Sequence, residues 1–315
     1  MDVCGLGTVA MDVLMQVDRL PGKDGFCTVE KTEYQPGGSG TNVIVQLARL
    51  GAACGYIASV SKDKYGLDIM ESLALEQVDT GCMAVSEEGI TVHTDIVIDK
   101  NGDKFILLNM GDVFGRLELN EERLAYIRNA RVFYTDLCPG GPAVKAVLDA
   151  GSHGVKTVFN MQAGLETMKG LGMTREEILG CLKAVDVFAP CQQGLYDLTE
   201  TKDLDECCRY LRSYTDGVLL FTLGSRGSVA YDGEGRKYEV PARAIKAVDT
   251  TGAGDSYMGG FIYAYYLRNR GLEDAMKFAT ACAAHTCGGL GARSSPGLEA
   301  VEEILLENQE EGGME

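Results

Sequence analysis

The chain has 315 residues, of which 45% are hydrophobic and 24% are charged, a composition typical of an ordinary globular protein. Its 46 acidic residues outnumber its 29 basic residues, so the formal net charge is −17. Phosphate contacts need clustered Lys and Arg, so this balance argues against nucleic acid or an anionic membrane as a partner. A local pocket can still take an anionic small substrate.

The chain also lacks the patterns of membrane and secreted proteins. No apolar run approaches the roughly 18–20 residues that span a bilayer, and the first residues lack the basic segment of a signal peptide. Eleven cysteines are scattered without a Cys-x-x-Cys pair, which argues against a structural zinc or iron–sulfur site. We therefore expect reduced thiols and a cytoplasmic protein.

Short apolar runs alternate with helical patterns along the chain. The runs predict strands at residues 3–7, 56–60, 132–134, 157–160, 186–189 and 218–222. Apolar residues at helical spacing predict helices at residues 42–50, 67–75, 144–149, 175–182 and 256–267. Strands that alternate with helices indicate an α/β fold with a mainly parallel central sheet and helices on both faces.

Two segments depart from this alternation. Residues 26–34 and 91–99 alternate apolar and polar side chains, and Asn101-Gly102 is a strong hairpin turn that leads into residues 104–108. We expect a small antiparallel β flap, or lid, with strands inserted at about residues 12–36 and 90–110 of a single domain of residues 1–306. Residues 307–315 are Glu-rich and predict a disordered acidic tail.

The most informative stretch is residues 249–256, which read Asp-Thr-Thr-Gly-Ala-Gly-Asp-Ser. Gly252 and Gly254 permit a tight turn before a helix, where backbone N–H groups are unpaired and the helix dipole is positive. We expect the N–H groups of Gly252, Ala253 and Gly254 to bind a transferring phosphate. Asp255, in the first turn, can accept a hydroxyl proton at the same point. The alternative without a catalytic role is that Asp249 or Asp255 only caps the helix and the glycines only shape the turn.

This stretch resembles the C-terminal signature of the ribokinase-like (PfkB) carbohydrate kinases. The Gly-Gly-Ser-Gly-Thr-Asn run at residues 37–42, with Leu-Ala-Arg-Leu-Gly at 47–51, resembles their other signature. Further family-like pieces follow in order at residues 7–12, 61–66, 78–80, 222–227 and 291–292, so the resemblance extends to about residue 306. It implies a ribokinase-like three-layer α/β/α sandwich and an ATP-dependent kinase acting on a hydroxymethyl group of a small sugar.

The resemblance also implies roles for individual residues. Asp255 would be the base, and the N–H groups of residues 252–254 would stabilise the γ-phosphoryl group. Sugar hydroxyls would be bound by Asp12, Gly38 and Asn42. The nucleotide would be bound by Thr222, Gly224, Ser225, Arg226, Gly227 and Cys191. A monovalent cation such as K⁺ would be bound by Asp249, Thr251, Gly291 and Ser295. Relatives often pair through the lid, which implies a homodimer.

Two positions depart from the family pattern. Where relatives carry Asn-x-x-Glu, which helps to organise magnesium, this chain has Cys191 and Gly194, and neither supplies a carboxylate. We therefore expect ATP oxygens and water to hold most of the Mg²⁺ coordination shell. Ser39 stands where several ribokinases carry Lys, which argues mildly against ribose and leaves ketose-type sugars slightly favoured.

Two other functions remain open at this point. One is a nucleoside kinase of the same family, and the other is a sugar- or nucleotide-binding protein with weak catalysis, suggested by Cys191 and Gly194. A dinucleotide oxidoreductase is disfavoured because Gly5-Leu6-Gly7 lacks the third glycine of the fingerprint. A serine hydrolase is disfavoured because no Gly-x-Ser-x-Gly segment occurs.

Overall fold

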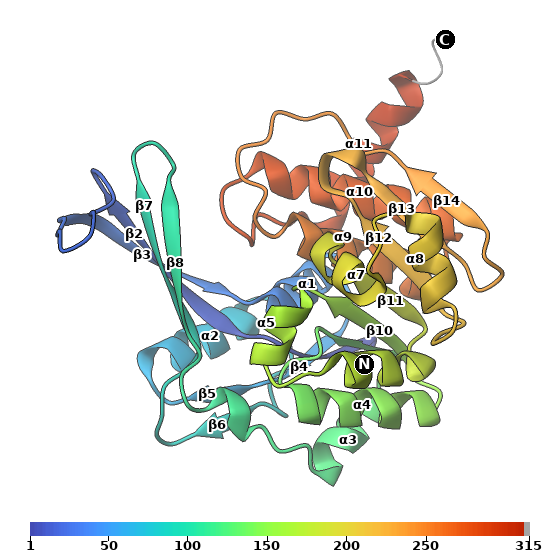
Figure 1. The fold of residues 1–315 in the computed structure, drawn as a ribbon, viewed down its shortest axis with the longest axis horizontal. Helices are drawn as coiled ribbons and strands as arrows, with labels where there is room; N and C mark the ends of the chain where they lie inside the picture. Colours follow the sequence, from blue (N-terminus) through green and yellow to red (C-terminus); the bar gives the residue numbers. More distant parts are fainter. Residues whose placement is uncertain (312–315) are drawn as a thin grey trace.

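The computed structural model describes the backbone of residues 1–311 and the side chains of residues 1–306. Eight strands make the central sheet: β1 (Val3–Leu6), β4 (Cys54–Ile57), β9 (Val132–Thr135), β10 (Lys156–Met161), β11 (Val187–Pro190), β12 (Val218–Thr222), β13 (Ser228–Tyr231) and β14 (Lys237–Val240). Their order is β14-β13-β12-β11-β10-β9-β1-β4 (Figure 1). The six strands from β12 to β4 are parallel, and β13 and β14 extend the sheet antiparallel. The predicted mainly parallel sheet is confirmed.

Helices cover both faces of this sheet. One face carries α1 (Ser39–Arg49), α2 (Lys64–Leu75), α9 (Ala253–Ile262), α10 (Leu272–Gly288) and α11 (Leu298–Glu311). The other carries α3 (Glu121–Arg128), α4 (Gly140–Ser152), α5 (Leu165–Gly170), α6 (Arg175–Cys181), α7 (Gln192–Thr199) and α8 (Leu204–Leu211). Because strand side chains alternate, β9 sends Val132 and Tyr134 into one core and Phe133 into the other. The three-layer α/β/α sandwich is confirmed.

Several boundaries differ from those that the sequence predicts. The strand expected at residues 56–60 is broken at Ala58: β4 ends before it, and β5 (Ser59–Ser61) pairs with β6 (Ala84–Ser86) in a separate two-stranded sheet. The helix expected at 256–267 begins at Ala253 and ends in a π-helical segment, Tyr263–Leu267. Helix α11 extends to Glu311, so the expected tail is helical at its start, and residues 312–315 lie outside the described residues.

The lid is a second sheet that projects from the central one (Figure 1). It consists of β2 (Ala10–Val17), β3 (Val29–Gly37), β7 (His93–Asp99) and β8 (Lys104–Asn109), in the order β3-β2-β7-β8. Each outer strand pairs antiparallel with its neighbour. The two central strands, β2 and β7, come from separate segments of the chain and pair in parallel. The lid is therefore a mixed sheet, and the expectation of a purely antiparallel flap is wrong.

Short 3₁₀ segments complete the architecture, at Phe114–Arg116, Leu182–Ala184 and Gly224–Arg226. No helix among residues 1–311 is both long and apolar enough to span a membrane. The loop after β1, the helix α1, the residues after β9 and β10, and the start of α9 contribute side chains to one region at the carboxyl edge of the central sheet. In open parallel sheets this edge is where ligands bind.

Candidate active site

The glycine-rich loop before α9 brings bare backbone to a helix N-terminus. Gly252 caps the helix with a φ of +77°, and a Cβ there would collide with the carbonyl oxygen of Ala292. Gly254, by contrast, faces open space. The N–H of Ala253 makes a long bond of 3.3 Å to the carbonyl oxygen of Thr250. This geometry is the kind that binds anions at a helix N-terminus.

Asp255 is nearly fully buried in the first turn of α9. Its Oδ2 accepts a hydrogen bond from Nδ2 of Asn42 at 2.9 Å, and its Oδ1 accepts one from Nε2 of Gln162 at 3.1 Å. Burial raises the pKa of Asp255 from its ordinary value of 3.8 to about 7, while the bond from Asn42 opposes this rise. The nearby carboxylate of Asp136 raises the pKa further. Asp255 therefore changes protonation state near neutral pH, where a general base works best.

Asp136 follows β9 and is a second buried carboxylate. Its Oδ2 accepts bonds from the N–H of Thr8 at 2.8 Å and from the Thr8 hydroxyl at 2.6 Å, and its Oδ1 accepts one from the N–H of Cys138 at 3.1 Å. Burial raises the pKa of Asp136 to about 6. The Thr8 hydroxyl oxygen in turn accepts the N–H of Gly40 at 3.0 Å. Asp136 thus supports the start of α1 through Thr8.

The residues expected to bind the sugar lie beside this pair of carboxylates. Asp12 projects from β2 and accepts a hydrogen bond from the hydroxyl of Thr94 on β7. Burial raises the pKa of Asp12, and the Thr94 bond and the positive charge of Arg293 oppose that rise. Gly38 caps α1 with a φ of +92°, and a Cβ there would press on the backbone of Val9. Two lid strands and α1 therefore contribute to one polar site.

A cavity of about 630 Å³ lies next to the start of α9. It is lined by four of the predicted nucleotide-binding residues, Thr222, Gly224, Ser225 and Gly227, and by Ala253 and Gly254 of the glycine-rich loop. Its other wall is α10, which contributes the small side chains of Thr280, Ala283, Ala284 and Cys287. A mostly apolar cavity of this size that opens onto an anion-binding loop suits a nucleotide.

Two predicted nucleotide-binding residues do not line this cavity, Arg226 and Cys191. Cys191 instead caps α7, because its sulfur accepts the N–H of Gly194 at 3.3 Å. Gly194 leaves no room for a side chain, since a Cβ would approach the carbonyl oxygen of Ala163 to 2.8 Å. A carboxylate at position 194 would therefore require a shift of the backbone.

The chain offers little protein ligation for Mg²⁺. Among the described residues, no group of three or more His, Cys, Asp or Glu side chains could hold a metal ion. The position at which the family resemblance predicts Glu is the sterically closed Gly194. These residues fit Mg²⁺ only if ATP and water provide most of its coordination shell, which agrees with the reluctance of this ion to dehydrate.

The residues expected to bind a monovalent cation are only partly brought together. Asp249 accepts bonds from the N–H of Thr251 at 3.0 Å, from the Thr251 hydroxyl at 2.7 Å and from the N–H of Gly291 at 3.0 Å. Ser295 is engaged differently, because Nη1 of Arg49 donates to its carbonyl oxygen at 2.9 Å and contacts its hydroxyl at 3.2 Å. A protein cation thus already occupies one side of Ser295.

Comparison with known proteins agrees with this geometry. The model of the pfkB family carbohydrate kinases matches residues 1–298. The chain belongs to the pfkB family. This carbohydrate kinase is 33% identical to an ATP-dependent ribose-1-phosphate kinase of Halopiger xanaduensis, over 97% of this chain and 98% of the relative. It is 29% identical to the ribokinase of Mus musculus, over 92% of this chain and 90% of the relative.

A solved structure confirms the ribokinase-like fold. The pfkB kinase superposes on Arabidopsis thaliana ribokinase complexed with ribose and ATP with a TM-score of 0.84, over 96% of this chain and 98% of that one, at 19% identity. At such low identity the superposition supports the fold alone. Family and fold, both inferred above from short glycine-rich runs, are thus confirmed.

Several residues of the site were missed by the sequence analysis of this kinase. Gln162 and Asp136 follow β10 and β9, and Thr94 lies in a lid strand. In the sequence, each of them is a polar residue in a predicted strand or shortly after one. Polar residues at such positions are too common to identify a site. Arg293 follows the family-like Gly-Ala of residues 291–292, and nothing in the local sequence indicated that it reaches Asn42.

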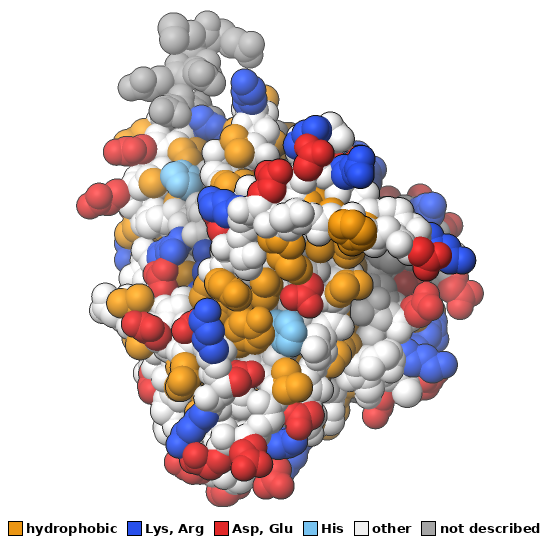
Figure 2. Space-filling view, turned by 90° about the vertical axis from the view of Figure 1, so that its left-hand side faces the viewer, with side chains coloured by type: hydrophobic (Ala, Val, Ile, Leu, Met, Phe, Trp, Pro, Cys, Tyr) orange, Lys and Arg blue, Asp and Glu red, His pale blue; other side chains and the backbone are white. Residues whose placement is uncertain are grey.

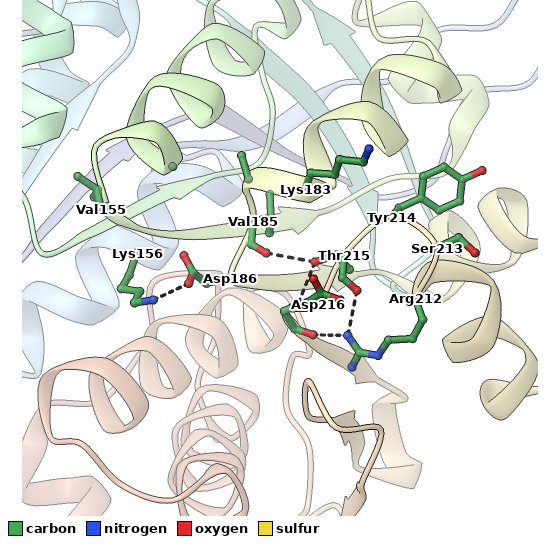
Figure 3. A pocket seen from close by; sticks show the side chains of 14 residues that line it. Val155, Lys156, Lys183, Val185, Asp186, Arg212, Ser213, Tyr214, Thr215 and Asp216 are labelled. Atoms are coloured by element: carbon green, nitrogen blue, oxygen red, sulfur yellow. Dashed lines mark hydrogen bonds and ion pairs between the residues drawn. The ribbon is translucent and has the colours of Figure 1, made fainter.

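A second cavity, of about 570 Å³, lies at the opposite, amino-terminal edge of β10, β11 and β12 (Figure 3). Three of its charged groups are already engaged: Lys156 pairs with Asp186 at 2.7 Å, and Nη1 of Arg212 donates to the carbonyl oxygens of Thr215 and Gly217. These contacts hold the loops of the pfkB fold together, and they assign no chemistry to this cavity.

Proposed function

We propose that this pfkB kinase transfers the γ-phosphoryl group of ATP to a hydroxymethyl group of a small sugar, with Asp255 as the general base. The observation that carries the proposal is the position of Asp255. It lies between residues suited to sugar hydroxyls and a nucleotide-sized cavity, and burial raises its pKa to about 7. A carboxylate with this pKa can take a proton from a hydroxyl during phosphoryl transfer.

In the proposed reaction, the sugar hydroxyl oxygen attacks the γ-phosphorus while Oδ1 or Oδ2 of Asp255 takes the hydroxyl proton. The bond from the γ-phosphorus to the oxygen of the leaving ADP breaks in line. The N–H groups of Gly252, Ala253 and Gly254 would stabilise the negative charge on the transferring group. When bound with ATP, Mg²⁺ would neutralise part of the phosphate charge.

On the sugar side, we assign Asp12, Gly38 and Asn42 to the binding of hydroxyl groups. Nδ2 of Asn42 carries a second hydrogen besides the one directed to Asp255, so it can donate to a substrate oxygen as well. The relatives named above act on ribose 1-phosphate or carry the name ribokinase. We therefore propose pentoses and their 1-phosphates as the first substrates to test, with ketoses beside them.

On the nucleotide side, we assign Thr222, Gly224, Ser225 and Gly227 to ATP, with α10 beside the base. K⁺ would bind at Asp249, Thr251 and Gly291, where a carboxylate and neighbouring loop oxygens are available. The contact with Arg49 argues that Ser295 contributes less than expected.

We further propose that the lid closes over the sugar and pairs two copies of the kinase. Phe105, Ile106, Leu107 and Leu108 of β8 follow one another and are 38–58% exposed, so both faces of this edge strand are apolar. Figure 2 views the molecule from the lid side and shows hydrophobic side chains gathered at the centre of that face. Exposed apolar patches of this kind commonly mark interfaces. Sedimentation should give the mass of a dimer that Ile106→Lys dissociates, and a wild-type monomer would contradict the pairing.

The cysteines support a reducing compartment. All eleven cysteines lie within the described residues and are unpaired. We propose that the kinase works in the cytoplasm, where thiols stay reduced and ATP is abundant.

The decisive experiment is ADP release from Mg-ATP against ribose, ribose 1-phosphate, ketoses and nucleosides, with and without K⁺. Turnover with one sugar that falls roughly 10²–10⁴-fold in Asp255→Asn would support the proposal. A matched control is Asp203→Asn, because Asp203 is likewise a carboxylate at a helix N-terminus, but it is the exposed N-cap of α8. Turnover only with nucleosides would replace the sugar by a nucleoside. ATP binding without turnover on any substrate would leave a binding protein.

A further inference from the structure

Arg293 lies in the loop between α10 and α11 and contacts α1 and α2. Its Nε donates to Oδ1 of Asn42 at 3.3 Å, its Nη2 to the hydroxyl of Thr41 at 3.3 Å, and its Nη1 to the hydroxyl of Ser72 at 2.6 Å. The same Asn42 donates from Nδ2 to Oδ2 of Asp255 at 2.9 Å. Arg293, Asn42 and Asp255 therefore form one chain of hydrogen bonds.

The polarity of this chain has only one solution when Asp255 is ionised. A guanidinium group has donors and no acceptor, and a carboxylate has acceptors and no donor. The side-chain amide of Asn42 has an acceptor oxygen and a donor nitrogen, and it is buried between Arg293 and Asp255. Arg293 must therefore face the amide oxygen of Asn42, which leaves the amide nitrogen to face Asp255.

Without Arg293, the Asn42 amide could turn over and present its oxygen to Asp255. That orientation would accept a hydrogen bond from a protonated carboxyl group and so favour the form that cannot act as a base. Two amide orientations of one buried side chain thus correspond to two protonation states of Asp255.

Arg293 remains charged in its surroundings. Burial lowers its pKa to about 10, the carboxylates of Glu76 and Asp12 act in the opposite direction, and the neighbouring cation Arg49 lowers it. A pKa of about 10 leaves the guanidinium protonated at neutral pH. The donor-only character on which the polarity depends therefore holds across the working range of the enzyme.

The titratable groups that act on Asp255 come from β9 and the residue after it, namely Tyr134 and Asp136. The other elements packed against Asp255 contribute uncharged side chains, which are Ser39 and Asn42 of α1 and Gln162 after β10. Of these neighbours, Asn42 is the one whose amide orientation Arg293 constrains.

We infer that Arg293 is a positioning residue: by donating to Oδ1 of Asn42, it holds the amide nitrogen towards Asp255 and so stabilises the ionised form of the base. The catalytic relevance of this inference rests on the proposed role of Asp255, but the effect on protonation can be measured without turnover.

The test compares Arg293→Met with wild type, each with and without Asp255→Asn. The difference in unfolding stability between the two members of each pair changes with pH between the unfolded and the folded pKa of Asp255, so its midpoint lies halfway between these two pKa values. We expect a tenfold higher proton affinity of folded Asp255 in Arg293→Met, which raises the folded pKa by about one and therefore moves the midpoint up by about half a pH unit. The acid limb of kcat/KM should move up by about one pH unit, with most of kcat recovered at high pH.

Arg49→Met is the matched control. Arg49 also donates to the 293–295 backbone and pairs with Glu76, but no bond joins it to Asn42 in the described residues. We expect it to lower stability without moving the midpoint. An equal shift in Arg49→Met, or an unmoved midpoint in Arg293→Met, would overturn the inference. If Arg293→Met does not fold, Arg293→Lys replaces it, with a smaller shift in the same direction expected and no shift counting against the inference.

The role of Asp255 as base and the role of Arg293 would be contradicted by different results. If Asp255→Asn keeps its turnover while the midpoint still moves in Arg293→Met, the base assignment is wrong and the positioning of Asn42 stands. If Asp255→Asn loses turnover and the midpoint does not move, the base assignment stands and the role of Arg293 is wrong.

Discussion

Replacing Asp255 with Asn should strongly reduce turnover and at the same time stabilise the protein. Asn has the size of Asp and can accept the bond from Asn42, but it cannot take a proton from a sugar hydroxyl. We expect kcat to fall roughly 10²–10⁴-fold, the range typical of a lost general base. Each tenfold loss corresponds to about 1.4 kcal/mol in the activation barrier.

The stability effect follows from the buried carboxylate. In the unfolded chain an Asp ionises near its ordinary pKa of 3.8, whereas burial raises the pKa of Asp255 in the folded state to about 7. An acid whose folded pKa is raised destabilises the fold once it ionises, so the cost is absent below pH 3.8 and complete above pH 7. The interval between these two pKa values corresponds to an upper bound of about 4 kcal/mol. Asn carries no such cost.

The assay is chemical denaturation of wild type and Asp255→Asn between pH 4 and pH 8.5, with ADP release measured on the same samples. We expect near-equal stability at pH 4 and a more stable Asn variant at pH 8. Asp203→Asn should show neither effect, because its carboxylate is an exposed helix cap that accepts the N–H of Glu206. A less stable Asn variant at pH 8 would refute the burial argument, and turnover within tenfold of wild type would refute the base assignment.

Three further substitutions test the two halves of the site. Gly252→Ala should destabilise the kinase by about 1–3 kcal/mol, measured by denaturation, because its φ is +77° and a Cβ collides with Ala292; unchanged stability would contradict this. A Cβ at Gly254 would have open space, so Gly254→Ala should fold normally and its free energy of unfolding should rise by up to about 1 kcal/mol. The added methyl group should nevertheless narrow the cavity and raise the KM for ATP. An unchanged KM would argue against the nucleotide assignment. Asp12→Asn should raise the KM for the sugar at least about tenfold while leaving the KM for ATP in place, and the opposite pattern would move Asp12 out of the sugar site.

Local sequence was sufficient for features that depend on a few consecutive residues. The strand β12 has the predicted bounds, and α1 covers most of the helix predicted at residues 42–50, although it begins earlier, at Ser39. Burial of one or both faces of an element leaves a periodic apolar pattern in the sequence. The glycine-rich loop before α9 could be located because the left-handed cap at Gly252 leaves few alternatives to glycine. Two of the lid strands, β3 and β7, could be expected from their alternation, and β8 from the Asn101-Gly102 turn before it.

Contacts between distant segments required the tertiary structure. β2 and β7 pair in parallel because the fold brings two separate insertions side by side, and no local pattern encodes that pairing. Cys191 was expected at the nucleotide, but its sulfur is used as a helix cap outside the cavity.

The division is clearest at Asp255. An Asp in the first turn of a glycine-capped helix is visible in the sequence, and with it the type of chemistry. The protonation behaviour of that Asp is decided by burial, by Gln162 from another strand end, and by an amide whose orientation depends on Arg293, which lies 251 residues from Asn42 along the chain. Burial and hydrogen-bond polarity are properties of the packed structure, so they become defined only when these segments meet.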